Sequence, residues 1–247
     1  IPAKISPEIS EKNLEKFSPT KFTSFDFGSE TRRALKKNYF LVREISRERL
    51  RDESRKAFSD GDPFAFVALL DELNLLKRIF PAVAATKNIA QPVRYHPFDV
   101  FAHTLLVLES ARELSPDPAL RLAALYHDVG KNDQYYAHTL GLSRQEIRET
   151  HGTRLNHYSS GPDFVEQDLK NLHFPRRTIE SVQRFVANHH KPGEILFSAR
   201  DQRPKKLRKL VSQAGYEMTQ NLIILAIADR LGQKNPLQNS ADFSDLE

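Results

Sequence analysis

The sequence predicts an all-α fold, and three observations support that prediction. Apolar residues recur every three to four positions over most of the 247-residue chain, as they do on the buried side of a helix. Pro and Gly separate these segments from one another. No stretch alternates apolar and polar residues convincingly as a strand would, and no internal repeat is visible. We therefore expect an extended lead-in at residues 1–28, a smaller helical unit at 29–92 and a larger one at 93–247.

Three amphipathic segments predict the smaller unit. Ser29 is expected to cap "SETRRALKKNYFLVREIS", and Ser46 to start "SRERLRDESRKAF". Asp62 and Pro63 open "DPFAFVALLDELNLL" with a capping residue followed by proline at the first helical position, where its missing N–H costs least. Residues 81–95 contain two prolines and are expected to form a connection.

The helical pattern strengthens in the larger unit. Its predicted helices are "FDVFAHTLLVLESAREL", "SPDPALRLAALYHD", "GPDFVEQDLKNL", "RRTIESVQRFVANHH" and "NLIILAIADRLG", with a polar stretch at 132–156. The longest apolar run, Leu222 to Ala228, has seven residues, whereas a membrane span needs about 20. The sequence therefore predicts no membrane span.

Composition narrows the function. With 39% hydrophobic and 28% charged residues the chain has a soluble globular balance, and no charged-then-apolar leader opens it, so we expect a cytoplasmic protein. Cysteine is absent, so any metal must be held by nitrogen and oxygen. The net charge of +5 fits either a solvated basic surface or a polyanionic partner such as RNA. The candidate RNA-binding residues form two clusters: Arg47, Arg49, Arg51 and Arg55, and Lys205, Lys206, Arg208 and Lys209.

Four titratable side chains fall on helix faces that should pack inward. Positions seven apart on a helix point in nearly the same direction, so His103 shares a face with Val100, Val107 and Leu114. The same argument places three more groups among apolar neighbours: His127, His189 and Asp229. A core histidine bound to a neighbouring carbonyl would explain a single case. A buried carboxylate such as Asp229 needs a partner, and metal coordination is one of the few that offset its burial.

The order of these residues carries a family resemblance. His103, then His127-Asp128, then Asp229 resembles the HD-domain metal-dependent phosphohydrolase superfamily. "SETRRALKKNYFLVREISRERLRDE", "FVALLDELNLLKRIFPAV", "HPFDVFAHTL" and "RLAALYHDVGK" resemble, in order, the neck and C-terminal body of bacterial tRNA nucleotidyltransferases and poly(A) polymerases. The resemblance covers about residues 27–232. It implies a helical HD bundle preceded by a neck-like unit that binds RNA.

The resemblance also implies a ligand set. It assigns a divalent ion to His103, His127, Asp128 and Asp229. A second ion or a phosphate would lie between His157 and His189, with His190 as an alternative in register. The remaining two histidines of the polar stretch, His138 and His151, are expected to be solvated loop residues.

Two imidazoles and two carboxylates suit Mn, Fe, Co, Ni, Zn or Mg. Such an ion acidifies water and draws a phosphoryl oxygen, so Asp128 and Lys131 are the expected catalytic residues. Lys131 lies three residues past Asp128 and either meets a phosphate or acts as a cation at a helix C-terminus. Arg230 is a weaker candidate for the same role.

Three functions remain open from the sequence. The first is a phosphohydrolase of nucleotide or RNA-end phosphoesters such as 2′,3′-cyclic phosphates. The second is a non-catalytic body that binds tRNA or another RNA, and the third is hydrolysis of dNTPs or guanosine polyphosphates. The family's catalytic head carries paired carboxylates after a Gly-Ser or Gly-Gly turn, but none follow Gly28-Ser29 here. We therefore expect no nucleotidyl transfer from this chain alone.

Overall fold

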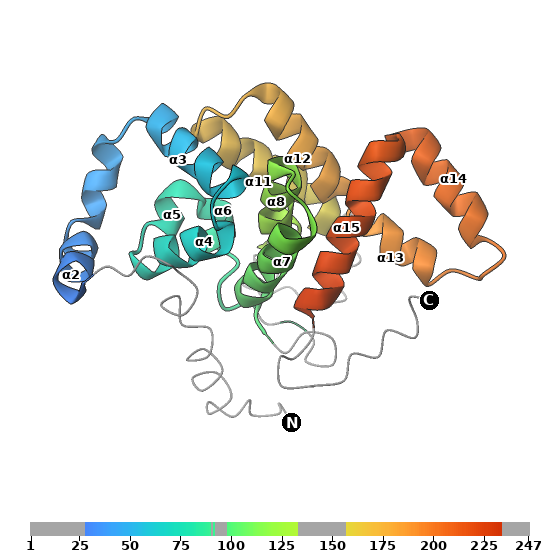
Figure 1. The fold of residues 1–247 in the computed structure, drawn as a ribbon, viewed down its shortest axis with the longest axis horizontal. Coiled ribbons are helices and arrows are strands. Elements are labelled where there is room, and N and C mark those ends of the chain that lie inside the picture. The colour runs from blue at the N-terminus through green and yellow to red at the C-terminus, as the bar shows by residue number, and fades with distance from the viewer. Residues whose placement is uncertain (1–27, 90, 92–97, 133–156, 234–247) are drawn as a thin grey trace, which may run out of the picture.

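A computed structural model describes residues 28–89, 91, 98–132 and 157–233. Every regular element within these residues is a helix and none is a strand, which confirms the all-α prediction (Figure 1). The lead-in, the predicted loop histidines His138 and His151, and nearly all of the polar stretch lie outside the described residues. No described helix is long and apolar enough to cross a bilayer.

The N-terminal part begins with α2 (Ser29–Lys37), a 3-10 turn η2 (Tyr39–Glu44) and α3 (Arg47–Ser59). The single helix predicted from Ser29 is therefore wrong, because it breaks at Asn38. Gly28, rather than Ser29, takes the N-cap position. The Ser46 prediction is confirmed: its hydroxyl accepts a hydrogen bond from the Arg49 amide at 3.3 Å.

Three short helices complete this part: α4 (Pro63–Glu72), α5 (Leu76–Ile79) and α6 (Pro81–Ala84). The Asp62 cap is confirmed, since its carboxylate accepts from the Ala65 amide at 2.9 Å. The predicted helix ends early because Asn74 adopts a left-handed conformation with φ of 59°, which asparagine tolerates better than most residues. The expected connection from residue 81 begins instead as α6, with Pro81 at its first position.

The C-terminal part surrounds the candidate site. Its helices are α7 (Val100–Leu114), α8 (Pro118–Tyr126), α11 (His157–Asn171), α12 (Arg176–Asn188), α13 (Lys191–Leu196), α14 (Arg203–Ala214) and α15 (Tyr216–Gly232). Helix α7 packs between α15, α8 and α4, and α12 packs against α11 and α8. Two sequence expectations need correction here. The α11 helix begins at His157, not at Gly161, and Leu114 is 42% exposed because it ends α7 beyond the packed face.

One hydrophobic core runs through both parts. The rings of Phe58 in α3, Phe80 before α6 and Tyr126 in α8 meet edge to face, with centroids 6.4 and 6.3 Å apart. The buried guanidinium of Arg121 in α8 donates to the carbonyls of Phe58 at 3.0 Å and Ser59 at 2.7 Å. These carbonyls end α3, so a side chain of the C-terminal part completes a helix of the N-terminal part.

A buried polar network reinforces this junction. The Ala82 amide of α6 and the Tyr126 hydroxyl both donate to Asp168 of α11, at 3.1 and 3.2 Å. Asn132 donates to the Ala82 carbonyl at 2.9 Å. Burial raises the pKa of the Asp168 carboxyl to about 7, although both hydrogen bonds act in the opposite direction. The network ties α6 to the turn that follows α8, which carries the candidate site.

Candidate metal centre

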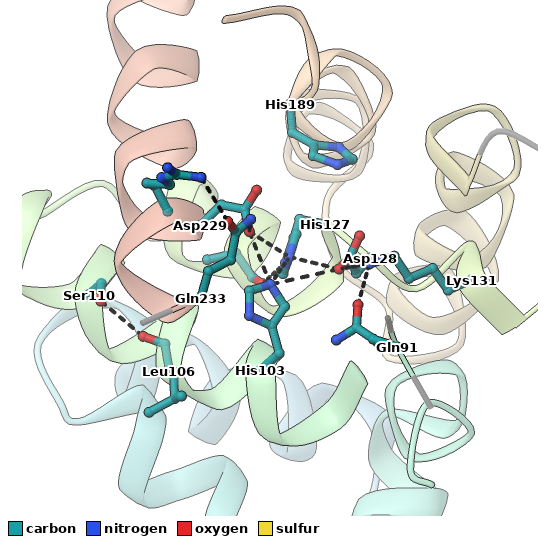
Figure 2. Close-up of polar contacts among 12 residues, drawn as sticks. Gln91, His103, Leu106, Ser110, His127, Asp128, Lys131, His189, Asp229 and Gln233 are labelled. Atoms are coloured by element: carbon teal, nitrogen blue, oxygen red, sulfur yellow. Dashed lines mark hydrogen bonds and ion pairs between the residues drawn. The ribbon is translucent and has the colours of Figure 1, made fainter. Parts of the chain in front are cut away.

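The four residues assigned to the first ion converge from three helices (Figure 2). The Nε2 atom of His103, in α7, lies 3.0 Å from Asp229 Oδ1 of α15 and 3.3 Å from His127 Nε2 at the end of α8. His127 Nε2 is also 3.3 Å from Asp128 Oδ2. His103, His127 and Asp128 are buried, whereas Asp229 keeps 28% of its side-chain surface exposed. We call His103, His127, Asp128 and Asp229 the first set.

The second candidate site shares Asp128. Its other oxygen, Oδ1, lies 3.2 Å from Nε2 of His157, the first residue of α11. His157 Nε2 is in turn 3.2 Å from Nε2 of His189, which follows the last residue of α12. We call Asp128, His157 and His189 the second set. Because each carboxylate oxygen faces a different set, Asp128 bridges the two.

His190, the alternative to His189, faces elsewhere. Its ring stacks on Tyr158 with centroids 3.6 Å apart and planes 18° from parallel. His189 instead has its ring centroid 5.6 Å from that of His127 and 5.1 Å from that of His157. The geometry therefore favours His189 as the member of the second set.

Two of the histidines are oriented by the same kind of hydrogen bond, from Nδ1 to the backbone carbonyl three residues earlier. His127 follows α8, and its Nδ1–H donates to the Ala124 carbonyl at 2.8 Å. His189 follows α12, and its Nδ1–H donates to the Val186 carbonyl at 2.7 Å. In the neutral ring a proton on Nδ1 leaves Nε2 as a bare lone pair. Both lone pairs therefore point into the cluster, the orientation that metal-ligating histidines commonly take.

Close helix contacts bring these side chains together. A Cβ on Gly130 would lie 1.9 Å from the His157 carbonyl oxygen, so only glycine lets the turn after Asp128 approach α11. A Cβ on Gly232 would lie 2.6 Å from a methyl group of Val107 and 3.4 Å from the ring of His103. The first contact sets the spacing of the two sets, and the second sets the approach of α15 to α7.

Electrostatics differ between the ligands. Burial opposes ionisation of Asp128, but the neighbouring charges of His127 and Lys131 outweigh it and hold the pKa of the Asp128 carboxyl well below its usual range. Burial likewise acts to raise the pKa of Asp229, yet its hydrogen bond to His103 and the charge of His127 lower that pKa to about 2. Both carboxylates are therefore ionised and available as ligands.

The pKa values of the histidines depend on how many carboxylates lie beside each ring. Burial lowers the pKa of His127, but Asp128 and Asp229 more than compensate, so the net shift is upward. In the second set burial dominates and lowers the pKa values of both His157 and His189 to about 4. The second set therefore presents neutral imidazoles at neutral pH, the form that binds metals.

The donor set fits a divalent cation. Donors bound at ~2.1 Å to one ion lie ~3.0–3.4 Å apart at octahedral to tetrahedral angles. Three separations in the structure fall in this range: 3.0 Å for His103–Asp229, 3.3 Å for His103–His127 and 3.2 Å for His157–His189. The Nε2 atoms of His157 and His189 face each other at 3.2 Å, so a cation between them could bind both lone pairs.

Lys131 adds a second kind of cation to the cluster. Its ammonium lies 2.6 Å from Asp128 Oδ2 and 2.6 Å from Oε1 of Gln91, and only 17% of its side-chain surface is exposed. Sequence reasoning missed Gln91, which falls in the expected connection and has no periodic or motif signal. Arg230 is exposed and lies 3.5 Å from Gln233, whose amide is 3.4 Å from Asp229.

The two predicted RNA-binding clusters occupy different helices. The first lies on α3, where Arg51 and Arg55 contact Asp52 at 2.9 and 3.9 Å. Arg51 also donates to the carbonyl of His173. The second lies on α14, a helix that was not predicted from the sequence. The α14 segment contains five basic residues and no acidic one: Arg203, Lys205, Lys206, Arg208 and Lys209.

Comparison with known proteins gives two family matches and one similar curated protein. Residues 24–87 match the family described as the probable RNA and SrmB-binding site of polymerase A. Residues 100–232, more than half of the 247, match the HD domain family. A stretch of 152 residues is 44% identical to a multifunctional CCA protein of Methylococcus capsulatus, covering 60% of this chain and 33% of that protein. The similarity thus spans about a third of the length of this curated relative. The HD match covers more than half of the chain, and together with the helical fold and the clustered His and Asp residues it shows that the chain belongs to the HD domain family.

Proposed function

We propose that this chain is a metal-dependent phosphohydrolase that acts on nucleotide or RNA-end phosphoesters, with 2′,3′-cyclic phosphates as the first substrates. One observation carries the proposal. Four imidazole Nε2 atoms face two carboxylates in a buried cluster, and Asp128 bridges the two halves. Their separations, 3.0 to 3.3 Å, are those expected of donors that share one divalent ion.

The proposed ligands are the first set for one ion and the second set for another ion or a phosphate. Mn, Fe, Co, Ni, Zn and Mg are all compatible with nitrogen and carboxylate donors. When bound, a divalent ion would supply Lewis acidity for a phosphoryl oxygen and would acidify a water molecule. His127 and His189 present their Nε2 lone pairs because the backbone holds their Nδ1 protons. Lys131 places a positive charge beside Asp128, where it can stabilise charge developing on a phosphoryl oxygen.

The substrate class rests on similarity as well as on chemistry. The neck match to an RNA-binding region and the relative named as a multifunctional CCA protein support RNA ends, tRNA among them, as substrates or partners. Hydrolysis of dNTPs or guanosine polyphosphates would use the same ligands and remains the alternative within the enzyme class. Nucleotidyl transfer is not proposed for this chain.

The test combines metal analysis with a substrate panel. The purified chain, reconstituted with Mn²⁺, Ni²⁺, Co²⁺ or Zn²⁺, is assayed on 2′,3′-cyclic nucleotides, nucleoside 2′- and 3′-phosphates, dNTPs and guanosine tetraphosphate. We expect bound metal and metal-stimulated hydrolysis of the cyclic or 2′-phosphates. Rapid cleavage of dNTPs or guanosine polyphosphates would change the substrate but keep the metal centre. Bound metal with no hydrolysis of any member of the panel would refute the enzyme proposal.

A non-catalytic RNA-binding body is the second candidate, and α14 favours it. Four α14 cations project from a helix whose buried contact is Leu210, and no acidic residue lies within α14 to neutralise them.

Binding of tRNA should weaken with salt by a log–log slope of about −0.7 to −0.9 per phosphate contact. Replacing Lys205, Lys206, Arg208 and Lys209 with Gln should reduce the magnitude of that log–log slope by about 3, because four phosphate contacts are lost. The same number of changes on α3, at Arg47, Arg49, Arg51 and Arg55, should have less effect, since Asp52 already pairs with Arg51 and Arg55. Equal effects on the two helices would remove the preference for α14.

A further inference from the structure

The environment of the Lys131 ammonium is defined by two short contacts. Figure 2 shows Lys131 reaching Asp128 from the side on which Gln91 lies. Both oxygens, Asp128 Oδ2 and Gln91 Oε1, are 2.6 Å from Lys131 Nζ. An ammonium has three donors. Two are engaged among the described residues, which leaves the third for a ligand oxygen.

Asp128 Oδ2 lies between two groups that would compete for it, the first set and the Lys131 ammonium. It belongs to the first set, 3.3 Å from His127 Nε2, and it also accepts the shorter bond from Lys131. A divalent ion held by the first set would draw on the same oxygen and repel the ammonium. A lysine ammonium on its flexible four-carbon stem would then turn outward unless another acceptor retained it.

Gln91 provides that acceptor. Its Nε2 donates toward the Phe98 carbonyl at 3.4 Å, which orients Oε1 toward Lys131. The carboxamide is neutral, so it holds the ammonium without cancelling the charge. Gln91 lies between residue 87, where the RNA-binding match ends, and residue 100, where the HD match begins, so neither family match includes it.

We propose that Gln91 is a positioning residue that keeps the Lys131 ammonium beside the metal centre, with its third N–H directed at a phosphoryl oxygen. The inference rests on the proposed function for its choice of ligand, a phosphate. It assigns a role in the site to a residue of the segment that joins the neck to the HD body. Gln91 acts through Lys131 and is not itself a metal ligand.

A double-substitution cycle tests the proposal without requiring turnover. Inorganic phosphate binding to the Mn²⁺-loaded chain is measured by calorimetry for wild type, Gln91→Met, Lys131→Met and the double variant. Gln213→Met, an exposed change on α14, is the matched control. Methionine keeps the length of glutamine but removes the acceptor. We expect Gln91→Met to weaken phosphate binding about 5-fold, the effect of one hydrogen bond, and to leave Mn²⁺ affinity within about twofold.

The cycle has a distinctive expected result. In the Lys131→Met background, Gln91→Met should change phosphate affinity by less than about 1.5-fold, because the two residues act as a unit. Equal effects in both backgrounds would overturn the proposal, as would loss of Mn²⁺ from Gln91→Met or no phosphate binding by wild type. If wild type binds phosphate and shows the expected cycle but hydrolyses no phosphoester, the proposed function fails while the role of Gln91 stands. On any substrate that is hydrolysed, Gln91→Met should lower kcat more than it raises KM.

Discussion

The two ligand sets are built from the same parts but differ in charge. Each contains a histidine that follows a helix and donates its Nδ1 proton to the carbonyl three residues earlier: His127 in the first and His189 in the second. The first set holds two carboxylates, Asp128 and Asp229, whereas the second has only its share of Asp128. Burial is therefore the largest influence in the second set, and it lowers the pKa values of His157 and His189 to about 4 despite the opposing charge of Asp128.

This difference shows that the types of ligand residue do not by themselves determine how tightly a site binds a divalent ion. The first set pairs each imidazole with an ionised carboxylate, which attracts a divalent cation strongly. The second set has less negative charge and depends on how Asp128 is shared. We expect the first set to bind a divalent ion more tightly, and the second to bind its ion or a phosphate more weakly.

The largest effect is expected at Asp128, because only this residue belongs to both sets. Asp128→Asn should remove bound metal from both and abolish hydrolysis, a loss greater than the ~10²–10³-fold cost of one stabilising contact. Elemental analysis and circular dichroism would show metal loss with the helices retained. Asp163→Asn, an exposed change on α11, is the control. Full metal content in Asp128→Asn would exclude the bridging role.

Lys131 should matter for rate but not for metal content. Lys131→Ala should reduce the turnover of a cyclic phosphate by ~10²–10³-fold while the chain still binds its metal, because the ammonium contacts Asp128 without belonging to either set. Steady-state kinetics on metal-saturated protein measure this. Lys170→Ala, on the surface of α11, should behave as wild type. A Lys131→Ala variant that lost metal would mean that the lysine supports the first set.

Separate substitutions should distinguish the two sets. Mn²⁺ titration of wild type should give a tight and a weak class of site. Asp229→Asn should weaken the tight class by at least roughly 10-fold, because even groups that only support a metal ligand contribute that much. His189→Gln should affect only the weak class, and His173→Gln, which lies in neither set, should affect none. Identical titrations for Asp229→Asn and His189→Gln would contradict the comparison.

The smallest effect concerns the stability of the metal-free chain in acid. His157 and His189 have folded pKa values of about 4, below the 6.5 of an unfolded histidine, so the unfolded chain takes up more protons between these values. Their contribution to stability is present above pH 6.5 and is lost as pH falls towards 4. Thermal melts in EDTA should therefore show less acid destabilisation for His189→Gln than for wild type. An unchanged pH profile would mean that His189 is already protonated or exposed.

The pKa of Asp168 is shifted upward, so its effect on stability has the opposite pH dependence. Its folded pKa of about 7 lies above the unfolded 3.8, so the stability it contributes is full below 3.8 and is lost as pH rises through 7. Asp168→Asn keeps an oxygen acceptor but cannot ionise, so this variant should lose that part of the pH dependence. A profile identical to wild type would show that the Tyr126 and Ala82 bonds, rather than burial, set the ionisation of Asp168.

Sequence reasoning succeeded where the chemistry is local. The caps at Ser46 and Asp62 depend on bonds to residues three positions away, and both are present. The family resemblance named the six residues that the structure brings together, whereas helix direction alone left a core-histidine explanation open. Gln91 could not be found because its partner, Lys131, is 40 residues away and only tertiary packing joins them. The α6 helix was missed because its Pro81 indicates a turn as readily as a helix start.

The guanidinium of Arg121 has a consequence for how this protein can be rearranged. It completes the carbonyl end of α3 from within the HD-matching part, and Phe58 packs through Phe80 to Tyr126 across the same boundary. A chimera joined near residue 90 would expose those carbonyls and aromatic rings on one side, and on the other would leave Arg121 with only its bonds to Ser115 and Arg112. We therefore expect such a chimera to be less stable than the intact pair, because each part completes the packing of the other.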